Sequence, residues 1–225
     1  MSWRDSNATH APDMFSIYHG TQVDLSIIIS YLPVYIFPTH HSLYTLTQHL
    51  VAGVSLGGHA SYLAIIHEPR ITAAVIVIGC PDYVRLMQHR AEKSRLECGT
   101  EGLFRSKEFP ENFLDVVSDI DPAAIGINEI LKRGLLNGKK ILSLSGGADK
   151  LVPFSCVEPF LKDLKEAYSA GTLDGELIDV VYPGIGHECT SEMVLELSKF
   201  VGRCVGEVNG ANRHDEAGAK PPSML

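Results

Sequence analysis

The sequence predicts an α/β fold: a mostly parallel, doubly wound sheet with helices on both faces and an inserted helical cap. From about residue 48 onward, short apolar runs alternate with segments of helical periodicity, which is the pattern of parallel βαβ winding. The runs are rich in Val, Ile or Leu without strict alternation, as expected for strands covered on both faces. A long polar stretch, residues 82–137, separates the second run from the third and indicates an insertion.

The strands of this sheet are predicted from four apolar runs. They are Leu50–Val54, Ala73–Ile78, Lys140–Leu144 and Leu177–Tyr182. Ahead of the first strand, Val23–Phe37 is predicted to form a helix interrupted at Pro33. A strand at Ile27–Ile29 is the alternative for that segment.

Helical patterns follow the predicted strands. Residues 57–67 form the first predicted helix, which ends at Glu68 because Pro69 restrains the residue before it. Apolar residues recur on one helical face in residues 154–168 and again in residues 193–204. The alternation of strands and helices therefore extends nearly to the end of the chain.

The chain is predicted to be one domain with an insertion. The core comprises residues 1–81 and 138–206, and residues 82–137 form the cap. Residues 207–225 are rich in Gly, Asn and charge and are expected to be a disordered tail. The cap would set substrate choice through apolar side chains, and the candidates are Tyr83, Leu86, Met87, Leu103, Phe104 and Phe109.

Composition excludes several classes of partner and places the protein in a reducing compartment. The formal net charge of −8 argues against binding to nucleic acid or to an anionic membrane. No long apolar run predicts a membrane span, and the N-terminus lacks a secretory signal. Five dispersed cysteines predict free thiols, so the cytoplasm is the expected location. The terminal Ser-Met-Leu, which differs from a peroxisomal Ser-Lys-Leu at one residue, makes the peroxisome the alternative.

A G-x-S-x-G motif lies where the first strand passes into the first helix. The motif is Gly53-Val54-Ser55-Leu56-Gly57. Such a turn is strained and exposes the serine Oγ at the carboxyl end of the sheet, while flanking glycines let strand and helix cross closely. The backbone N–H of Leu56, at the start of the helix, can stabilise an oxyanion. A glycine-rich turn with an inert serine is the alternative.

A serine nucleophile needs a base, and the base needs a carboxylate that orients it. Asp149 follows the third predicted strand and His187 follows the fourth, in the order that a G-x-S-x-G enzyme requires. Asp82, which follows the second strand, is the alternative acid. A helix-capping role for Asp149 and a surface position for His187 remain open at this point. The sequence contains no metal-binding motif, and we expect neither a metal nor an organic cofactor.

With these residues in place, the chain resembles the α/β-hydrolase superfamily, and in particular a set of little-characterised fungal serine hydrolases. The resemblance runs from about Asp13 to Val205 and is carried by residues 13–18, 53–59 and 78–83. It implies hydrolysis of an ester, a thioester or a related acyl group. Some relatives of this kind occur in secondary-metabolite gene clusters, so a role in fungal secondary metabolism is the corresponding expectation.

Compared with the family that it resembles, the chain is expected to be N-terminally short. Only 54 residues precede Ser55, and they contain no clear strand and loop that would supply the second oxyanion N–H. Loss of one such donor lowers the rate on the order of 10²–10³-fold. The first strand would also have an open edge, which a second copy in a homodimer could complete.

The sequence thus predicts a serine hydrolase that acts on a small-molecule acyl substrate. Ser55 attacks the acyl carbonyl, His187 acts as general base, and Asp149 holds the histidine tautomer. Two alternatives remain. One is a truncated, weak or catalytically silent binding protein, and the other is an acyltransferase or cyclase that uses the same three residues.

Overall fold

The computed structural model describes residues 3, 6–39, 46–96 and 102–217. The chain divides into two units, residues 1–189 and residues 190–225. The first unit contains all four strands and seven helices, and the second contains the last helix. The fold and the candidate site described below belong to the first unit.

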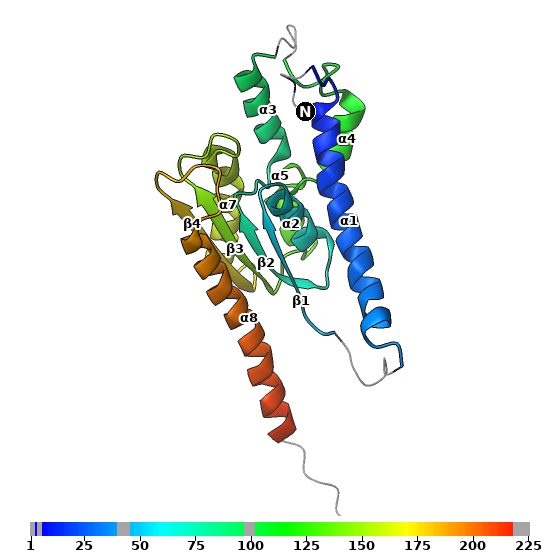
Figure 1. The fold of residues 1–225 in the computed structure, drawn as a ribbon, viewed down its shortest axis with the longest axis vertical. Helices are drawn as coiled ribbons and strands as arrows, with labels where there is room; N and C mark the ends of the chain where they lie inside the picture. The colour runs from blue at the N-terminus through cyan, green and yellow to red at the C-terminus, as the bar shows by residue number, and fades with distance from the viewer. Residues whose placement is uncertain (1–2, 4–5, 40–45, 97–101, 218–225) are drawn as a thin grey trace, which may run out of the picture. The chain divides into compact units, whose positions relative to one another are not determined.

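The core of the first unit is a parallel sheet of four strands in the order β1-β2-β3-β4 (Figure 1). The strands are β1 (His49–Val54), β2 (Ile71–Val77), β3 (Lys139–Gly146) and β4 (Gly175–Tyr182). All three pairings are parallel. Every predicted strand lies within an observed one, apart from Ile78 at the end of the second. The predicted α/β class is therefore confirmed.

The two central strands are buried along nearly their whole length, whereas β1 is not. In β1 only Val51 is buried, and Val54 is 47% exposed. Among the described strands, β1 pairs with β2 alone, so its other edge carries unpaired N–H and C=O groups. This is the open edge that the sequence predicts.

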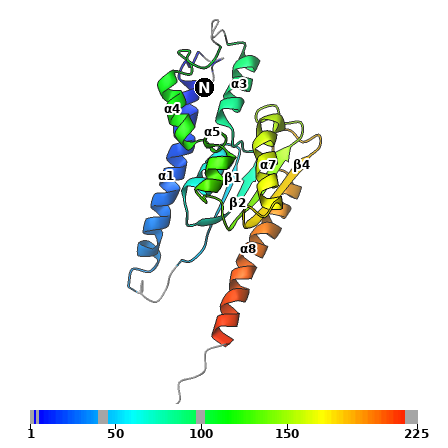
Figure 2. The same ribbon diagram turned by 180° about the vertical axis from the view of Figure 1, so that it is seen from behind.

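Two helices that follow strands pack against the sheet. Helix α2 (Leu56–His67) contacts β1 and β2, and residues 58–66 are all buried. Helix α7 (Phe154–Ser169) contacts β4, next to which it lies in Figure 2, and it buries its apolar residues. The predictions for residues 57–67 and 154–168 are confirmed within one residue at each end.

The long stretch between β2 and β3 is helical. It contains α3 (Tyr83–Ser94), α4 (Glu111–Ile120), α5 (Pro122–Ile125) and α6 (Ile127–Lys132). The helices fall within the predicted cap, residues 82–137. Its action as a cap over the substrate stays a prediction.

Helix α1 (His10–Ile36) differs from the prediction. It begins 13 residues before Val23, and Pro33 lies inside it without ending it, so the alternative strand at Ile27–Ile29 is wrong. The earlier half forms because Ala11, Phe15, Tyr18 and Gln22 share one buried face, and α1 packs on α2. Pro33 removes one backbone donor only a turn before the helix ends, so the helix continues to Ile36.

Helix α8 (Ser191–Ala217) makes up the described part of the second unit. The predicted end of the core at residue 206 therefore falls inside a helix. A glycine in a helix costs only about 1 kcal/mol relative to alanine, so Gly206 and Gly210 weaken the helical pattern without forbidding it. The disordered tail expected for residues 207–225 stays a prediction, and residues 218–225 lie outside the described part.

The structure bears on two expectations from composition, the free cysteines and the lack of a membrane span. The cysteines within the described residues are free thiols, as predicted, and Cys98 lies outside that part. Across the described helices, none combines the length and the apolar character that a membrane span requires.

Candidate active site

Ser55 forms the turn between β1 and α2, as the motif predicts. Its backbone has φ 54° and ψ −110°, a conformation that non-glycine residues rarely adopt. The neighbouring strand holds the turn in place, because the Ser55 N–H donates to the Val77 carbonyl at 2.9 Å. The side chain of Ser55 is thereby fixed at the carboxyl end of the sheet.

Close packing at this turn depends on one of the two motif glycines and on two glycines outside the motif. A Cβ on Gly53 would collide with the Gly57 backbone, so the glycine before Ser55 is required. A Cβ on Gly57 would meet nothing within 4 Å, so a steric role for that glycine is wrong. The second close approach is between Gly58 and Gly79, where a Cβ on Gly79 would lie 2.6 Å from the Gly58 carbonyl carbon. Strand β2 and helix α2 cross there.

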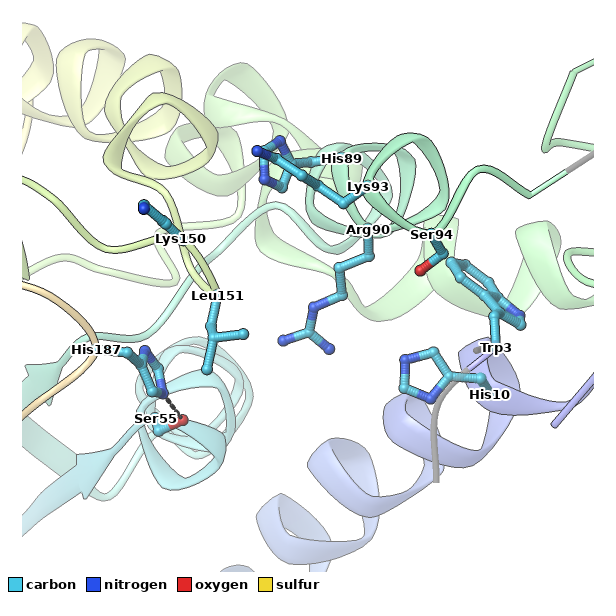
Figure 3. A pocket seen from close by; sticks show the side chains of 10 residues that line it. All are labelled: Trp3, His10, Ser55, His89, Arg90, Lys93, Ser94, Lys150, Leu151 and His187. Carbon is cyan, nitrogen blue, oxygen red and sulfur yellow. Dashed lines mark hydrogen bonds between the residues drawn. The ribbon is translucent and has the colours of Figure 1, made fainter. Parts of the chain in front are cut away.

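The structure brings Ser55, His187 and Asp149 into one hydrogen-bonded chain. The Ser55 Oγ lies 2.7 Å from His187 Nε2 (Figure 3). On the other side of the ring, His187 Nδ1 lies 2.7 Å from Asp149 Oδ2. Because a carboxylate can only accept, His187 carries its proton on Nδ1, and Nε2 accepts from the serine hydroxyl. The three residues that the sequence singles out therefore meet, 132 positions apart at the widest.

Asp149 is held as a partner for His187. Its side chain is fully buried, and Oδ1 accepts hydrogen bonds from the N–H groups of Leu151 and Val152 at 2.8 and 2.9 Å. Helix α7 begins after Pro153 without a side-chain cap, so the capping role for Asp149 is wrong. His187 is not a surface residue either, since only 21% of its side chain is exposed.

Backbone hydrogen bonds join the loop of the acid to the loop of the histidine. The N–H of Gly147 donates to the Tyr182 carbonyl, and the N–H of Ala148 donates to the Ile185 carbonyl, both at 2.8 Å. Gly146 lies so close to the same loop that a Cβ there would reach the Ile185 and Gly186 carbonyl oxygens. The two loops thus form one rigid support for the Asp149–His187 pair.

The structure places the alternative acid, Asp82, elsewhere. Asp82 is the N-cap of α3, where its side chain accepts from the Arg85 N–H at 2.8 Å and pairs with Arg85 Nε at 3.1 Å. Asp82 therefore caps the first helix of the stretch between β2 and β3.

One backbone donor is in position for an oxyanion. Leu56 is the first residue of α2, so its N–H has no acceptor within the helix and carries part of the positive end of the helix dipole. In the described residues that precede β1, the structure has helix α1 and no strand. A second donor is not assigned.

His59 is a buried residue near the site that takes no part in the hydrogen bonds joining Ser55, His187 and Asp149. Its Nδ1 accepts the Cys80 N–H at 2.8 Å, and its ring packs against Tyr18 with centroids 4.6 Å apart. Burial lowers the pKa of His59 to about 4, so the ring is neutral at physiological pH.

A cavity of about 570 Å³ lies beside Ser55 and His187. Its lining residues are Trp3, His10, Ser55, His89, Arg90, Lys93, Ser94, Lys150, Leu151 and His187 (Figure 3). None of the six predicted apolar cap residues is among them. Five of these, all but Phe104, are buried, and all six are packed in the hydrophobic core.

The sequence carries a signal for this lining that the prediction missed. In α3 the buried positions Tyr83, Leu86, Met87 and Ala91 share one face, and Arg90, four residues after Leu86, lies on the same side of the helix and so faces inward. Trp3 and His10 reach the cavity only because α1 packs on α2, which no local pattern reveals.

Comparisons with solved structures show the fold. TT1662 from Thermus thermophilus is similar with a TM-score of 0.57 and 18% identity, over 88% of this chain and 68% of that one. SOBER1 from Arabidopsis thaliana has a TM-score of 0.42 and 15% identity over 78% of this chain. The acylaminoacyl peptidase of Pyrococcus horikoshii has a TM-score of 0.44 and 14% identity over 69% of this chain.

This chain spans about 61% of the length of SOBER1 and 22% of that peptidase. No protein-family model and no curated protein matches the sequence. The likeness to TT1662 supports the α/β fold and no more, because identity is low.

Proposed function

We propose that the protein is a serine hydrolase that cleaves an ester or thioester through an acyl-enzyme. The observation that supports this most is the continuous chain from Ser55 Oγ through His187 to Asp149, with both links at 2.7 Å. This is the arrangement that turns a serine hydroxyl into a nucleophile in unrelated folds. The strained turn at Ser55 is a second support, since strain of this kind concentrates at functional sites.

The mechanism follows from the geometry. Ser55 Oγ attacks the acyl carbonyl carbon while its proton passes to His187 Nε2, and Asp149 stabilises the imidazolium that forms. The Leu56 N–H donates to the oxyanion. The leaving alcohol or thiol takes the proton from His187, and a water molecule activated by the same ring then releases the acid.

The assay for this proposal uses two simple substrates. The wild type should hydrolyse para-nitrophenyl butyrate and a butyryl thioester, and Ser55→Ala should lower kcat by about 10³-fold or more. Ser118→Ala is the matched control, because Ser118 is an exposed serine on α4 whose hydroxyl donates to the Leu114 carbonyl of its own helix. Equal activity of Ser55→Ala and wild type would rule out the proposed nucleophile.

The second candidate function is a catalytically silent binding protein. The unassigned second oxyanion donor favours it, because a site with one donor is on the order of 10²–10³-fold slower. A folded wild type without Ser55-dependent turnover of either substrate would support it. The acyltransferase alternative predicts transfer to an added alcohol in place of hydrolysis.

Two finer predictions depend on sequence alone. A role in fungal secondary metabolism follows only from the resemblance of residues 13–18, 53–59 and 78–83. A cytoplasmic location follows only from cysteine usage and the N-terminal composition.

A further inference from the structure

The charge of the cavity beside Ser55 is opposite to that of the protein. The chain has 27 acidic residues against 19 Lys and Arg, yet no carboxylate is among the described residues that line the cavity. Its lining includes Arg90, Lys93 and Lys150, together with three histidines. A cavity lined in this way attracts anions and repels cations.

Arg90 is the central residue of this set. Its side chain extends from α3 into the cavity, and the guanidinium lies between the Ser55–His187 end and the Trp3–His10 end (Figure 3). It makes no ion pair with any carboxylate in the described part of the chain. Arg85, earlier on the same helix, does pair with Asp82. The phenol of Tyr18, which interacts with Arg90, does not neutralise it, because burial raises the pKa of Tyr18 to about 12.

A further donor stands at the far end of the cavity. Trp3 is 7% exposed, and its Nε1 is buried without a hydrogen-bond partner among the described residues. Buried N–H groups without a partner are rare and invite an acceptor. An oxygen of a bound molecule in the cavity could accept from this group.

We propose that the cavity selects acyl substrates that carry an anionic group, a carboxylate or a phosphate, which Arg90 binds while the scissile carbonyl lies at Ser55. This inference rests on the proposed function. The planar fork of a guanidinium binds two oxygens of either anion at once, which a neutral acyl chain cannot offer. Lys150, which also lines the cavity, adds to the positive potential that attracts the anion.

The test compares esters matched in length. The para-nitrophenyl monoester of glutarate carries a carboxylate, para-nitrophenyl 4-phosphonobutyrate carries a phosphonate in place of a phosphate, and para-nitrophenyl valerate is neutral. The wild type should show a higher kcat/KM for an anionic ester than for the neutral one. Arg90→Gln should lower the ratio of these two kcat/KM values on the order of 10- to 100-fold, mainly by raising KM for the anionic ester. The anionic ester that is preferred identifies the group.

Controls separate binding from folding. Arg85→Gln, the same change on the same helix but outside the cavity, should leave the ratio unchanged. Turnover of the valerate ester by Arg90→Gln shows that the variant is folded. If Arg90→Gln does not fold, two other measurements provide the same test. Arg90→Lys should lower the ratio, and free glutarate or inorganic phosphate should compete with the anionic ester in wild type. An unchanged ratio together with no competition would overturn the proposal.

The two proposals fail in different ways. Equal kcat/KM for the three esters in wild type, or an unchanged ratio in Arg90→Gln, would contradict the anionic substrate and leave the hydrolase intact. If wild type turns over no ester, the hydrolase proposal fails. Calorimetric binding of glutarate or inorganic phosphate, lost in Arg90→Gln, would then still support the anion site, and no binding would sink it.

Discussion

At the level of single residues, Asp149 shows how a buried carboxylate is directed to one histidine. One of its oxygens is occupied by two backbone N–H groups of its own loop, so the other is left for His187 Nδ1. Asp82 has the same side chain at the end of a neighbouring strand, but it bonds to Arg85 at the start of α3. The local turn, and not the residue type, decides which aspartate serves the histidine.

This difference predicts that the same conservative substitution lowers kcat strongly at Asp149 and hardly at all at Asp82. Asp149→Asn should lower kcat by about 10⁴-fold with the fold retained, because an amide no longer selects the required histidine tautomer. Asp82→Asn, which keeps an N-capping side chain, should leave kcat within a few-fold of wild type. Steady-state kinetics on an ester that both variants bind provide the measurement. A large loss of kcat in Asp82→Asn, with Asp149→Asn near wild type, would make Asp82 the acid.

His59 makes folding stability depend on pH. Its folded pKa of about 4 lies below the ordinary value of 6.5, so the unfolded chain binds a proton that the folded protein excludes. This contribution is complete above pH 6.5 and is lost as the pH falls toward 4, by on the order of 3 kcal/mol. Denaturant unfolding of wild type and His59→Asn at a series of pH values measures it.

His59→Asn keeps an acceptor for the Cys80 N–H but cannot titrate. The variant should be less stable at neutral pH and should lack most of the decline between pH 6.5 and 4. An equally steep decline in the variant would assign the acid sensitivity to other groups.

At the level of elements, the crossing of β1 and α2 depends on one glycine of the motif and not on the other. Gly53→Ala should destabilise the protein by several kcal/mol, because its Cβ would collide with the Gly57 backbone. Gly57→Ala should be neutral or stabilise by up to about 1 kcal/mol, because its Cβ meets open space in the first turn of α2. Thermal unfolding of the two variants tests this, and similar losses in both would contradict the described turn.

The elements that could be predicted are those with a local signature. Parallel strands are short apolar runs, and the sequence predicts all four of them, with Ser55, Asp149 and His187 following three of the strands in the correct order. The start of α1 and the Trp3–His10 end of the cavity could not be predicted, because both depend on how α1 packs. Ala11 and Phe15 are buried only once α1 lies on α2, and Trp3 and His10 line the cavity for the same reason.

At the level of the whole molecule, α1 displays an unusual amount of apolar surface. Its exposed residues include Tyr31, Val34 and Tyr35, the last of which is 79% exposed. Exposed apolar patches of this kind promote association, and the open edge of β1 adds unpaired backbone groups. The expected homodimer stays a prediction from the sequence.

Surface substitutions on α1 should change solubility without changing stability. Val34→Lys together with Tyr35→Glu should raise the concentration at which light scattering begins, with the free energy of unfolding within about 0.5 kcal/mol of wild type. Phe15→Ala, on the buried face of the same helix, should cost about 3–5 kcal/mol. A large loss of stability in the double variant would show that this surface is covered.

The central claim is that His187 and Asp149 activate Ser55, and covalent labelling tests it most directly. A fluorophosphonate reacts with a serine only when its hydroxyl is activated by a neighbouring base. The account predicts that intact mass spectrometry will show one adduct per folded chain, mapped to Ser55, with much slower labelling in His187→Ala and Asp149→Asn. Folded wild-type protein that stays unlabelled at Ser55, or labelling that does not depend on His187, would contradict it.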